Sequence, residues 1–169
     1  MKKSILFGAG KIARGFLGQL LYLSDFEITF VDVYEPIVSV LNEKKTYHVH
    51  VLGDESLDSD VTHIKAYLFD EKESIYHTFY ESDIAFVSVG GNHLTDVAKS
   101  LADIFNRFGI QKKIKNIIVC ENWRDAANTF KTAMLKFLNE ENKNLFEKFI
   151  GVSEAVLMRT ATQPDEELA

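Results

Sequence analysis

The chain has 169 residues, 46% of them hydrophobic and 26% charged, which is the composition of one globular domain with a core of its own. Its net charge of −6 argues against a nucleic-acid partner or an anionic membrane surface, because both require a basic patch. The single cysteine, Cys120, excludes an intrachain disulfide framework, and with no evident secretory signal or membrane-length apolar run we expect a cytoplasmic protein.

Apolar runs and helical patterns alternate through the first half of the chain. A short apolar run precedes a glycine-rich turn, and a helical stripe follows it, formed by Ile12, Phe16, Leu17, Leu20 and Leu21. A second apolar run precedes Pro36, which suits the first turn of a helix. An acidic solvated loop is expected over 53–60. Strands are predicted at 4–7, 28–33, 47–51 and 64–68, and a further helix at 72–80.

The second half continues the alternation. A strand at 84–89 ends at a glycine pair, a long helix covers 94–108, and a strand follows at 116–120. Helical spacing then runs from Trp123 to Phe137, and a last strand lies around 149–158. Alternating strands and helices predict an α/β fold, a doubly wound and mostly parallel sheet of the Rossmann type covered on both faces. We expect residues 1–169 to form one such domain, and the tail from Gln163 to Ala169 resembles the beginning of a segment that the chain does not finish.

The stretch LFGAGKIARGFLGQLL contains a G-x-G-x-x-A pattern between the first strand and the first helix. Gly8 permits the tight turn, Gly10 has no Cβ to block a ligand, and Ala13 allows close packing of helix on strand. The helix that begins near Lys11 directs N–H groups and a positive dipole end toward the turn. The pattern favours the pyrophosphate of a dinucleotide; the alternatives are a turn that only reverses the chain and a site for S-adenosylmethionine.

An acidic residue after the second strand supports the dinucleotide. Asp32 lies 22 residues after Gly10, where a carboxylate accepts hydrogen bonds from the adenosine ribose hydroxyls. The same carboxylate repels a 2′-phosphate, and it is followed by Val33 and Tyr34 rather than by an arginine. We therefore predict NAD rather than NADP.

Two later strands end at the same edge of the sheet. Gly90, after the strand at 84–89, lets the backbone lie against a cofactor, although a simple strand-to-helix turn explains it equally well. Asn122 contacts the nicotinamide ribose or amide, or else it caps a helix that starts at Trp123. No catalytic residue is expected within the chain. The predicted cofactor-binding residues are Gly8, Ala9, Gly10, Lys11, Ile12, Ala13, Asp32, Val33, Val89, Gly90, Glu121 and Asn122.

Several segments together carry a family likeness. In order along the chain they are FGAGKIARGFLGQLL, ITFVDV, TYHVHVLG, FVSVGG, IIVCEN and GVSEAVLMR. The chain resembles the N-terminal Rossmann half of the polyol-specific long-chain dehydrogenases, the family of mannitol dehydrogenase and mannitol-1-phosphate 5-dehydrogenase. The resemblance implies that Gly8, Gly10, Ala13 and Asp32 bind the adenosine diphosphate half of the cofactor, with Gly90 and Asn122 nearer the nicotinamide.

The resemblance also implies an activity. It is the metal-independent, NAD-linked interconversion of a polyol or polyol phosphate, such as mannitol 1-phosphate, with its ketose, such as fructose 6-phosphate. In that family a lysine on a helical C-terminal domain is the general base, and that domain, which supplies most substrate contacts, is absent here. We therefore expect NAD binding without turnover. The family carries an Asp before the residue equivalent to Arg159, whereas this chain has Met158, which leaves the polyol undetermined. The alternative function is a stand-alone nucleotide-sensing Rossmann module with a regulatory role.

Other residues have chemistry that we expect to be structural. His48 and His50 alternate on one strand face, but a metal site needs further ligands, so we expect a half-exposed face and no metal. His93 is interpreted as a helix-start residue, although it is also close enough in sequence to reach a nicotinamide. Cys120 is interpreted as a small buried hydrophobic residue. Arg14 contacts either a phosphate or a carboxylate of the absent domain.

Overall fold

The computed structural model describes residues 1–162, and the tail predicted from Gln163 onward lies outside them. A six-stranded parallel sheet has the order β5-β2-β1-β6-β7-β8, as the α/β prediction requires. A separate antiparallel hairpin is formed by β3 and β4. The strands are β1 (Lys2–Phe7), β2 (Phe26–Asp32), β3 (Tyr47–Val49), β4 (Ser59–Val61), β5 (Ile64–Leu68), β6 (Ile84–Val87), β7 (Lys115–Val119) and β8 (Ile150–Glu154).

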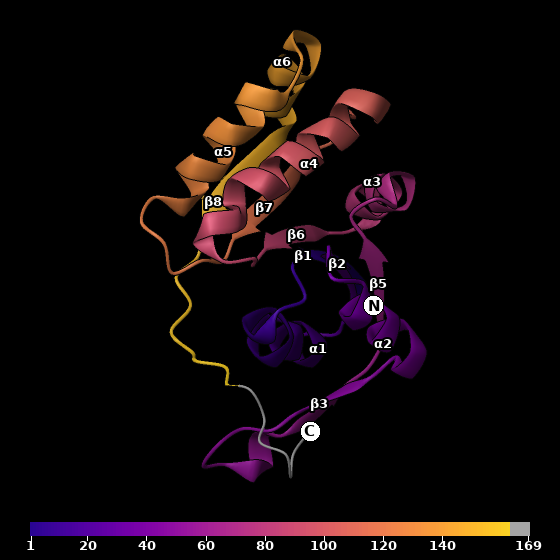
Figure 1. The fold of residues 1–169 in the computed structure, drawn as a ribbon, viewed down its shortest axis with the longest axis vertical. Coiled ribbons are helices and arrows are strands. Elements are labelled where there is room, and N and C mark those ends of the chain that lie inside the picture. The colour runs from indigo at the N-terminus through magenta and orange to yellow at the C-terminus, as the bar shows by residue number, and fades with distance from the viewer. Residues whose placement is uncertain (163–169) are drawn as a thin grey trace.

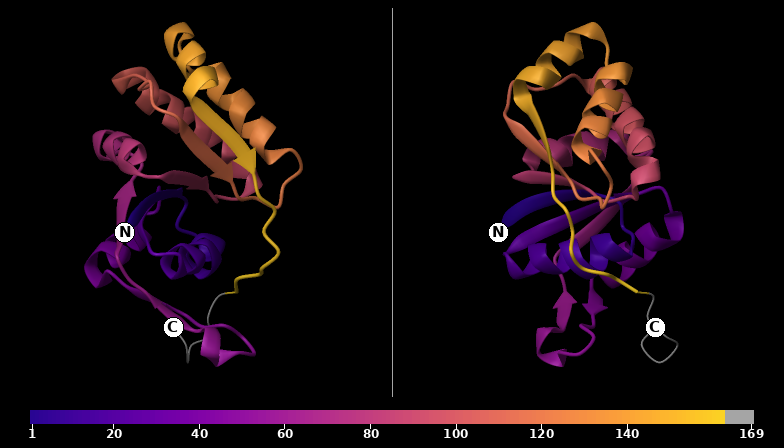
Figure 2. Two further views of the ribbon diagram at one scale, coloured as in Figure 1. Left: turned by 180° about the vertical axis from the view of Figure 1, so that it is seen from behind. Right: turned by 90° about the vertical axis from the view of Figure 1, so that its left-hand side faces the viewer.

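Helices cover both faces of the sheet, as Figures 1 and 2 show. One face packs against α3, α4, α5 and α6, and the other against α1, α2 and the hairpin. Alternation along β1 produces this division, because Ile5 and Phe7 point to the first face and Leu6 to the second. The helices are α1 (Gln19–Leu23), α2 (Glu35–Lys44), α3 (Lys72–Glu81), α4 (Leu94–Phe108), α5 (Ala126–Phe137) and α6 (Glu140–Phe149).

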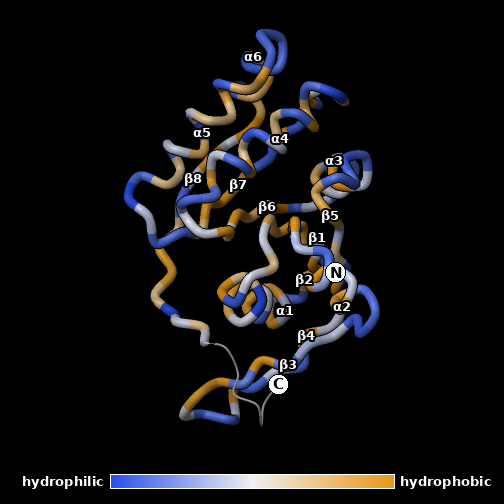
Figure 3. Tube along the Cα trace, viewed as in Figure 1, coloured by the Kyte–Doolittle hydropathy of each residue, from blue (hydrophilic) through white to orange (hydrophobic). Residues whose placement is uncertain are grey.

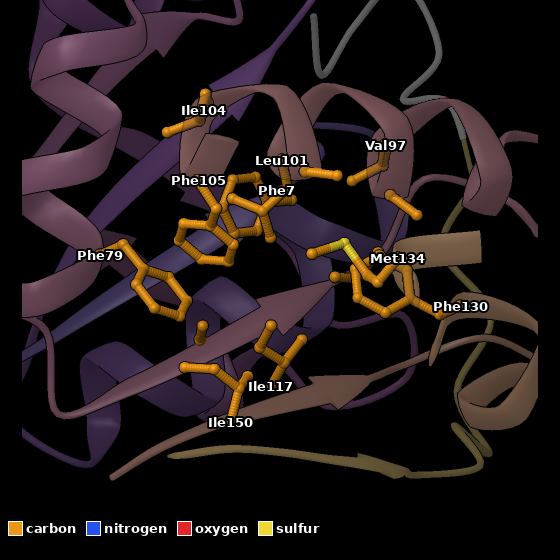
Figure 4. Close-up of a cluster of buried hydrophobic side chains, with 14 of the residues drawn as sticks. Phe7, Phe79, Val97, Leu101, Ile104, Phe105, Ile117, Phe130, Met134 and Ile150 are labelled. Atoms are coloured by element: carbon orange, nitrogen blue, oxygen red, sulfur yellow. The ribbon is translucent and has the colours of Figure 1, made fainter. Parts of the chain in front are cut away.

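The larger core lies between the sheet and α3–α6. Leu101 and Phe105 of α4 meet Phe7 of β1 there, while Phe130 and Met134 of α5 pack over β7 (Figure 4). All five side chains are fully buried. Each such side chain stabilises the fold by roughly 1.5–3 kcal/mol through burial of apolar surface. Figure 3 shows the corresponding hydropathy, with apolar residues along the strands and polar ones at the turn after α2.

The first helix differs from the predicted stripe. Residues Ala13–Gly18 form a π-helical segment, η1, before α1 begins. A π-turn bonds residues five apart, so it rotates the side chains that follow relative to an α-helix. Leu17 and Leu21 are buried as expected, but Leu20 is 45% exposed. The stripe prediction was therefore wrong at Leu20, and wrong in part at Ile12 and Phe16, which are only half-buried.

The segment after α2 also differs from its prediction. The strand expected over 47–51 ends at Val49, and the expected loop at 53–60 contains a 3₁₀ turn (Glu55–Leu57) and the first residues of β4. Tyr47 pairs with Val61, and His48 with Asp60, across this hairpin. The sequence pattern did not predict β4, because Ser59 and Asp60 are polar and only Val61 faces the core. The hairpin extends away from the main sheet (Figure 2).

The C-terminal third contains one helix that the sequence pattern did not predict. Helix α6, Glu140–Phe149, separates α5 from β8. In addition, Trp123 lies before α5 and is 49% exposed, so it does not belong to the helical stripe. The last strand ends at Glu154 rather than at 158. None of the helices in residues 1–162 has the length and apolarity needed to cross a membrane.

The strand order reverses between β1 and β6, and the loops that follow these two strands lead away from each other. After β1 the chain adds β2 and β5 on one side of the sheet. After β6 it adds β7 and β8 on the other side. In open α/β sheets ligands bind at the carboxyl end of the strands beside such a reversal. The fold therefore places a binding crevice between the loop after Phe7 and the loop after Val87.

Candidate functional site

A cleft with a volume of about 1010 Å³ occupies this position. The loops after β1, β2, β5, β6 and β7 contribute to its walls. Helix α4 and the segment 157–161, which runs from β8 past the first helix (Figure 1), complete them. The volume lies at the upper end of the range for small-molecule and cofactor sites. The cleft is large enough for a ligand that extends across both halves of the sheet.

Eleven of the twelve predicted cofactor residues line the cleft. The exception is Ala9, which lies beneath the surface with 1% of its area exposed and donates its N–H to Asp32. Sequence reasoning missed the walls that do not follow a motif. These missed residues are Val31, Phe69, Ser88, Asp96, Val97, Ser100, Leu157, Met158, Thr160 and Ala161.

The two glycines of the turn have different environments. Gly8 has φ +103°, and a Cβ there would overlap the carbonyl oxygen of Ser88 at the end of β6. Its N–H donates to the carbonyl of Val31 at 2.7 Å. Gly10 has no atom within 4 Å of an added Cβ, and it opens on the cleft. The fold thus requires glycine at position 8, whereas the space over Gly10 is open toward the cleft.

Asp32 is fixed from below by backbone groups. Its Oδ2 accepts the Ala9 N–H at 2.6 Å, and its Oδ1 accepts the Tyr34 N–H at 3.0 Å. Both bonds hold the carboxylate at the cleft wall, where it is only half-buried. The carboxylate therefore orients the glycine turn and still presents lone pairs to a ligand.

Arg14 contacts the backbone of the glycine turn, and its two predicted partners, a phosphate or a carboxylate of a further domain, stay predictions. Its guanidinium donates to the carbonyl oxygen of Ala9, on the inner side of the turn. Burial lowers the pKa of this side chain, although nearby Asp32 partly offsets that effect. Tyr47 donates its hydroxyl to the Arg14 carbonyl at 2.9 Å, and burial raises the pKa of this phenol. These contacts make Arg14 a support for the turn.

The opposite wall contains a second carboxylate. Glu121 Oε1 accepts the N–H of Val89 at 2.5 Å and that of Gly90 at 2.7 Å. Gly90 has φ +85°, a backbone conformation that favours glycine at this position of the loop. Asn122 lines the cleft. Its alternative role as a helix cap was wrong, because α5 begins at Ala126 with Asp125 in the preceding position.

His93 and Cys120 also line the cleft. His93 directly precedes α4, as the helix-start interpretation predicts, and its Nδ1 lies 3.8 Å from Asp96 Oδ2. Cys120 is 2% exposed, and burial raises the pKa of its thiol to about 12. The prediction of a small buried residue at position 120 is confirmed.

Arg159, which follows Met158 in the segment used for the family resemblance, points toward the first helix. Its Nη1 donates to Gln19 Oε1 at 2.7 Å, and its guanidinium carbon lies 5.5 Å from the centre of the Phe16 ring. Met158 is 92% exposed beside it. These contacts attach the segment after β8 to the π-helical segment and close one end of the cleft.

Comparison with known families agrees with this architecture. Residues 2–168 match the family model described as the mannitol dehydrogenase Rossmann domain. The chain belongs to the mannitol dehydrogenase family. Membership of a dehydrogenase family with a Rossmann domain implies a nicotinamide cofactor, and it argues against the S-adenosylmethionine alternative.

Curated relatives of this mannitol dehydrogenase domain carry a common name. Mannitol-1-phosphate 5-dehydrogenase of Thermoanaerobacter pseudethanolicus is 38% identical over 80% of the chain, and that of Shouchella clausii is 36% identical over 93%. The enzyme of Clostridium acetobutylicum is 33% identical over 98%. The chain spans 35%, 42% and 43% of these three relatives, respectively.

Solved structures show the same fold at low sequence identity. GDP-mannose dehydrogenase from Pseudomonas aeruginosa matches 92% of the chain and 35% of its own length, with a TM-score of 0.58 and 18% identity. Malate dehydrogenase from Picrophilus torridus matches 88% of the chain and 44% of its own length, with a TM-score of 0.55 and 18% identity. At these identities the likeness establishes the Rossmann fold.

Proposed function

We propose that this domain binds NAD in the cleft and forms the cofactor-binding part of an oxidoreductase. The observation that carries the proposal is the pairing of an open Gly10 with a carboxylate, Asp32, held at the same end of the cleft. Backbone without a side chain suits a pyrophosphate, and a fixed carboxylate suits ribose hydroxyls. The cleft volume fits a dinucleotide.

The residues divide between the two ends of that ligand. We assign the turn from Gly8 to Ala13 and Asp32 to the adenosine diphosphate half. Gly90, Glu121 and Asn122 receive the nicotinamide half at the opposite wall. NAD is preferred to NADP because a 2′-phosphate would face the Asp32 carboxylate, and the adjacent Val33 offers no positive charge.

The substrate class follows from the relatives. Because the curated relatives are named mannitol-1-phosphate 5-dehydrogenases, we propose a polyol phosphate and its ketose as the substrate pair of the whole enzyme. When bound, the nicotinamide exchanges a hydride with the substrate. We place the general base, a lysine by resemblance, on a helical C-terminal domain outside these residues, so this domain by itself binds NAD and does not turn over.

Calorimetry tests the cofactor. NADH is expected to bind the domain at least tenfold more tightly than NADPH, and Asp32→Ser is expected to reduce this preference. Glu43→Gln, which removes an exposed carboxylate of α2, is the matched control and leaves both affinities unchanged. Tighter binding of NADPH, or no binding of either cofactor, would contradict the proposal.

A kinetic assay tests the division of labour. NADH oxidation with fructose 6-phosphate is measured for this domain and for a full-length mannitol-1-phosphate 5-dehydrogenase of the family. We expect turnover only from the full-length protein, because a hydride acceptor needs a positioned proton donor. Turnover by the domain at a comparable rate would show that the proposed base position is wrong.

A further inference from the structure

The hairpin of β3 and β4 contains a group of ligand-type side chains that the dehydrogenase site does not use. His48, His50 and Asp58 each present one nitrogen or oxygen atom, and these three atoms lie within 4.8 Å of one another. The sequence-based expectation of no further ligand near the histidines was incomplete, because Asp58 is contributed by the segment that leads into β4. None of the residues from 47 to 61 lines the cleft, and the hairpin extends away from the main sheet (Figure 2).

The hydrogen bonds orient each of these side chains. Asp58 Oδ1 accepts the Val51 N–H at 2.7 Å, which leaves Oδ2 facing both rings. That Oδ2 lies 2.7 Å from His50 Nδ1 and 3.5 Å from His48 Nε2. The carboxylate is therefore anchored by one oxygen and free to share the other.

A second carboxylate lies behind His48. Asp60 Oδ1 is 2.8 Å from His48 Nδ1, and Asp58 Oδ2 is 3.5 Å from Nε2 of the same ring. In the tautomer with its proton on Nδ1, the ring directs the Nε2 lone pair toward the side of Asp58. A carboxylate that accepts from the far nitrogen of a histidine is the arrangement that orients histidine ligands in metal sites. A half-exposed strand face requires neither the anchored Asp58 carboxylate nor the Asp60 carboxylate that orients His48.

We propose that His48 Nε2, His50 Nδ1 and Asp58 Oδ2 bind a divalent transition-metal ion, with zinc as the best match. Two imidazoles and a carboxylate suit zinc. The ion would displace the proton shared by His50 Nδ1 and Asp58 Oδ2, releasing it to solvent, and the two side chains would rotate slightly apart to reach metal–ligand distances of about 2.0–2.2 Å. Three protein ligands leave a fourth position for water. The site is separate from the proposed cofactor cleft and does not depend on it.

The metal would join two separated parts of the hairpin. It links the end of β3 to the segment before β4, and this hairpin in turn contacts the first helix. Gln19 Nε2 donates to the Leu57 carbonyl at 2.7 Å and to Ser59 Oγ at 3.1 Å. Tyr47 of β3 also donates its hydroxyl to the Arg14 carbonyl at 2.9 Å, so binding is expected to stabilise the packing of the hairpin against the first helix.

Calorimetry of the untagged protein with zinc chloride tests the site. We expect one zinc per chain and no competition from magnesium. His50→Gln and Asp58→Asn are expected to weaken binding roughly a hundredfold and Asp60→Asn roughly tenfold, because the last removes only an orienting group. His77→Gln, an exposed histidine of α3, is the control and leaves the affinity unchanged. Equal affinity in Asp58→Asn, His50→Gln and the unmodified protein would overturn the proposal.

Nitrogen-15 spectra of the histidine rings provide a test that needs no variant. On addition of zinc, the ring nitrogens of His48 and His50 are expected to shift, and those of His63, His77 and His93 to stay unchanged. A signal from metal-bound His48 Nε2 and His50 Nδ1 supports the proposed ligand atoms. An absence of saturable shifts at both rings would overturn it.

Discussion

Gly8 and Gly10 belong to one motif, but their surroundings differ. Gly8 sits against the Ser88 carbonyl with a positive φ, so any larger residue there must displace the backbone of β6. Gly10 has open space above it. A sequence pattern shows both positions as glycine, but only the structure separates the glycine that the fold requires from the glycine that borders open space.

Alanine is expected to reduce stability at position 8 and NADH affinity at position 10. Gly8→Ala lowers the free energy of unfolding by about 2 kcal/mol or more, through strain and overlap. Gly10→Ala changes it by less than about 0.5 kcal/mol but weakens NADH binding at least tenfold. Urea unfolding and calorimetry measure the two effects. Destabilisation of equal size in both variants would contradict this assignment.

A buried lysine makes stability depend on pH. Lys115, at the start of β7, is 5% exposed and donates its amine to the Ser82 carbonyl. Burial, assisted by Lys113, lowers the pKa of this amine from 10.5 to about 8. Below pH 8 the amine is charged in both the folded and the unfolded state. Between about pH 8 and 10.5 only the unfolded chain keeps the proton, so stability rises with pH.

The comparison variant is Lys115→Met, which has no titrating group at this position. Relative to that variant, the unmodified protein is expected to gain about 1–3 kcal/mol of unfolding free energy between pH 7 and pH 10. Urea unfolding at several pH values measures the difference. A pH-independent difference would show that the amine is not perturbed.

Elements with strong periodicity were predicted closely, and elements held by polar contacts were not. The bounds of α4, Leu94–Phe108, match the expected helix, since its apolar residues recur on one face over four turns. Helix α6 offers little such signal: Leu145, Phe146 and Phe149 are its only large apolar residues. The π-helical segment is likewise invisible to an analysis that assumes α-helical spacing.

Asparagines explain why α6 forms. Asn139 caps it by accepting the Asn142 N–H at 2.9 Å. Asn142 is 3% exposed and ties α6 to the end of α4, with its oxygen accepting the Ile110 N–H at 3.1 Å and its nitrogen donating to the Phe105 carbonyl at 3.0 Å. These contacts depend on residues more than 30 positions apart, which local patterns do not report.

Removing the Asn142 amide is expected to leave the Ile110 N–H without its partner, whereas the Phe105 carbonyl keeps the Gly109 N–H as a donor. Asn142→Ala should therefore lower the free energy of unfolding by about 1–3 kcal/mol. Asn144→Ala, two residues along the same helix on its exposed face, should change it by less than about 0.5 kcal/mol. Thermal and urea unfolding of the pair measure this. Similar losses in both variants would show that α6 is held by its helix propensity instead.

For the whole molecule, the sheet topology determines which residues meet. Motifs at the ends of β1, β2, β6 and β7 were identified from sequence because parallel strands bring their carboxyl ends together. The walls from α4 and from 157–161 were not, because their placement depends on how a helix and a trailing segment pack across the sheet. The part of the cleft formed at the carboxyl edge of the sheet is thus predictable from sequence, and the walls formed by α4 and by residues 157–161 are not.

A dinucleotide that spans this cleft is expected to couple the two halves of the sheet. At a free NADH concentration of about one hundred times its dissociation constant, unfolding should cost about 2.7 kcal/mol more. Amide hydrogen exchange should slow both after β1 and after β6, although these loops are some 80 residues apart in the sequence. Protection confined to one loop would show that the ligand does not reach across the cleft.

The separate roles of Gly8 and Gly10 also bear on how such a domain changes during evolution. A descendant that lost its cofactor would still need the first glycine in order to fold, whereas the second would be free to drift. Among divergent copies of this domain, retention of both glycines would mark those that still carry a ligand, and retention of Gly8 alone those that survive as scaffolds.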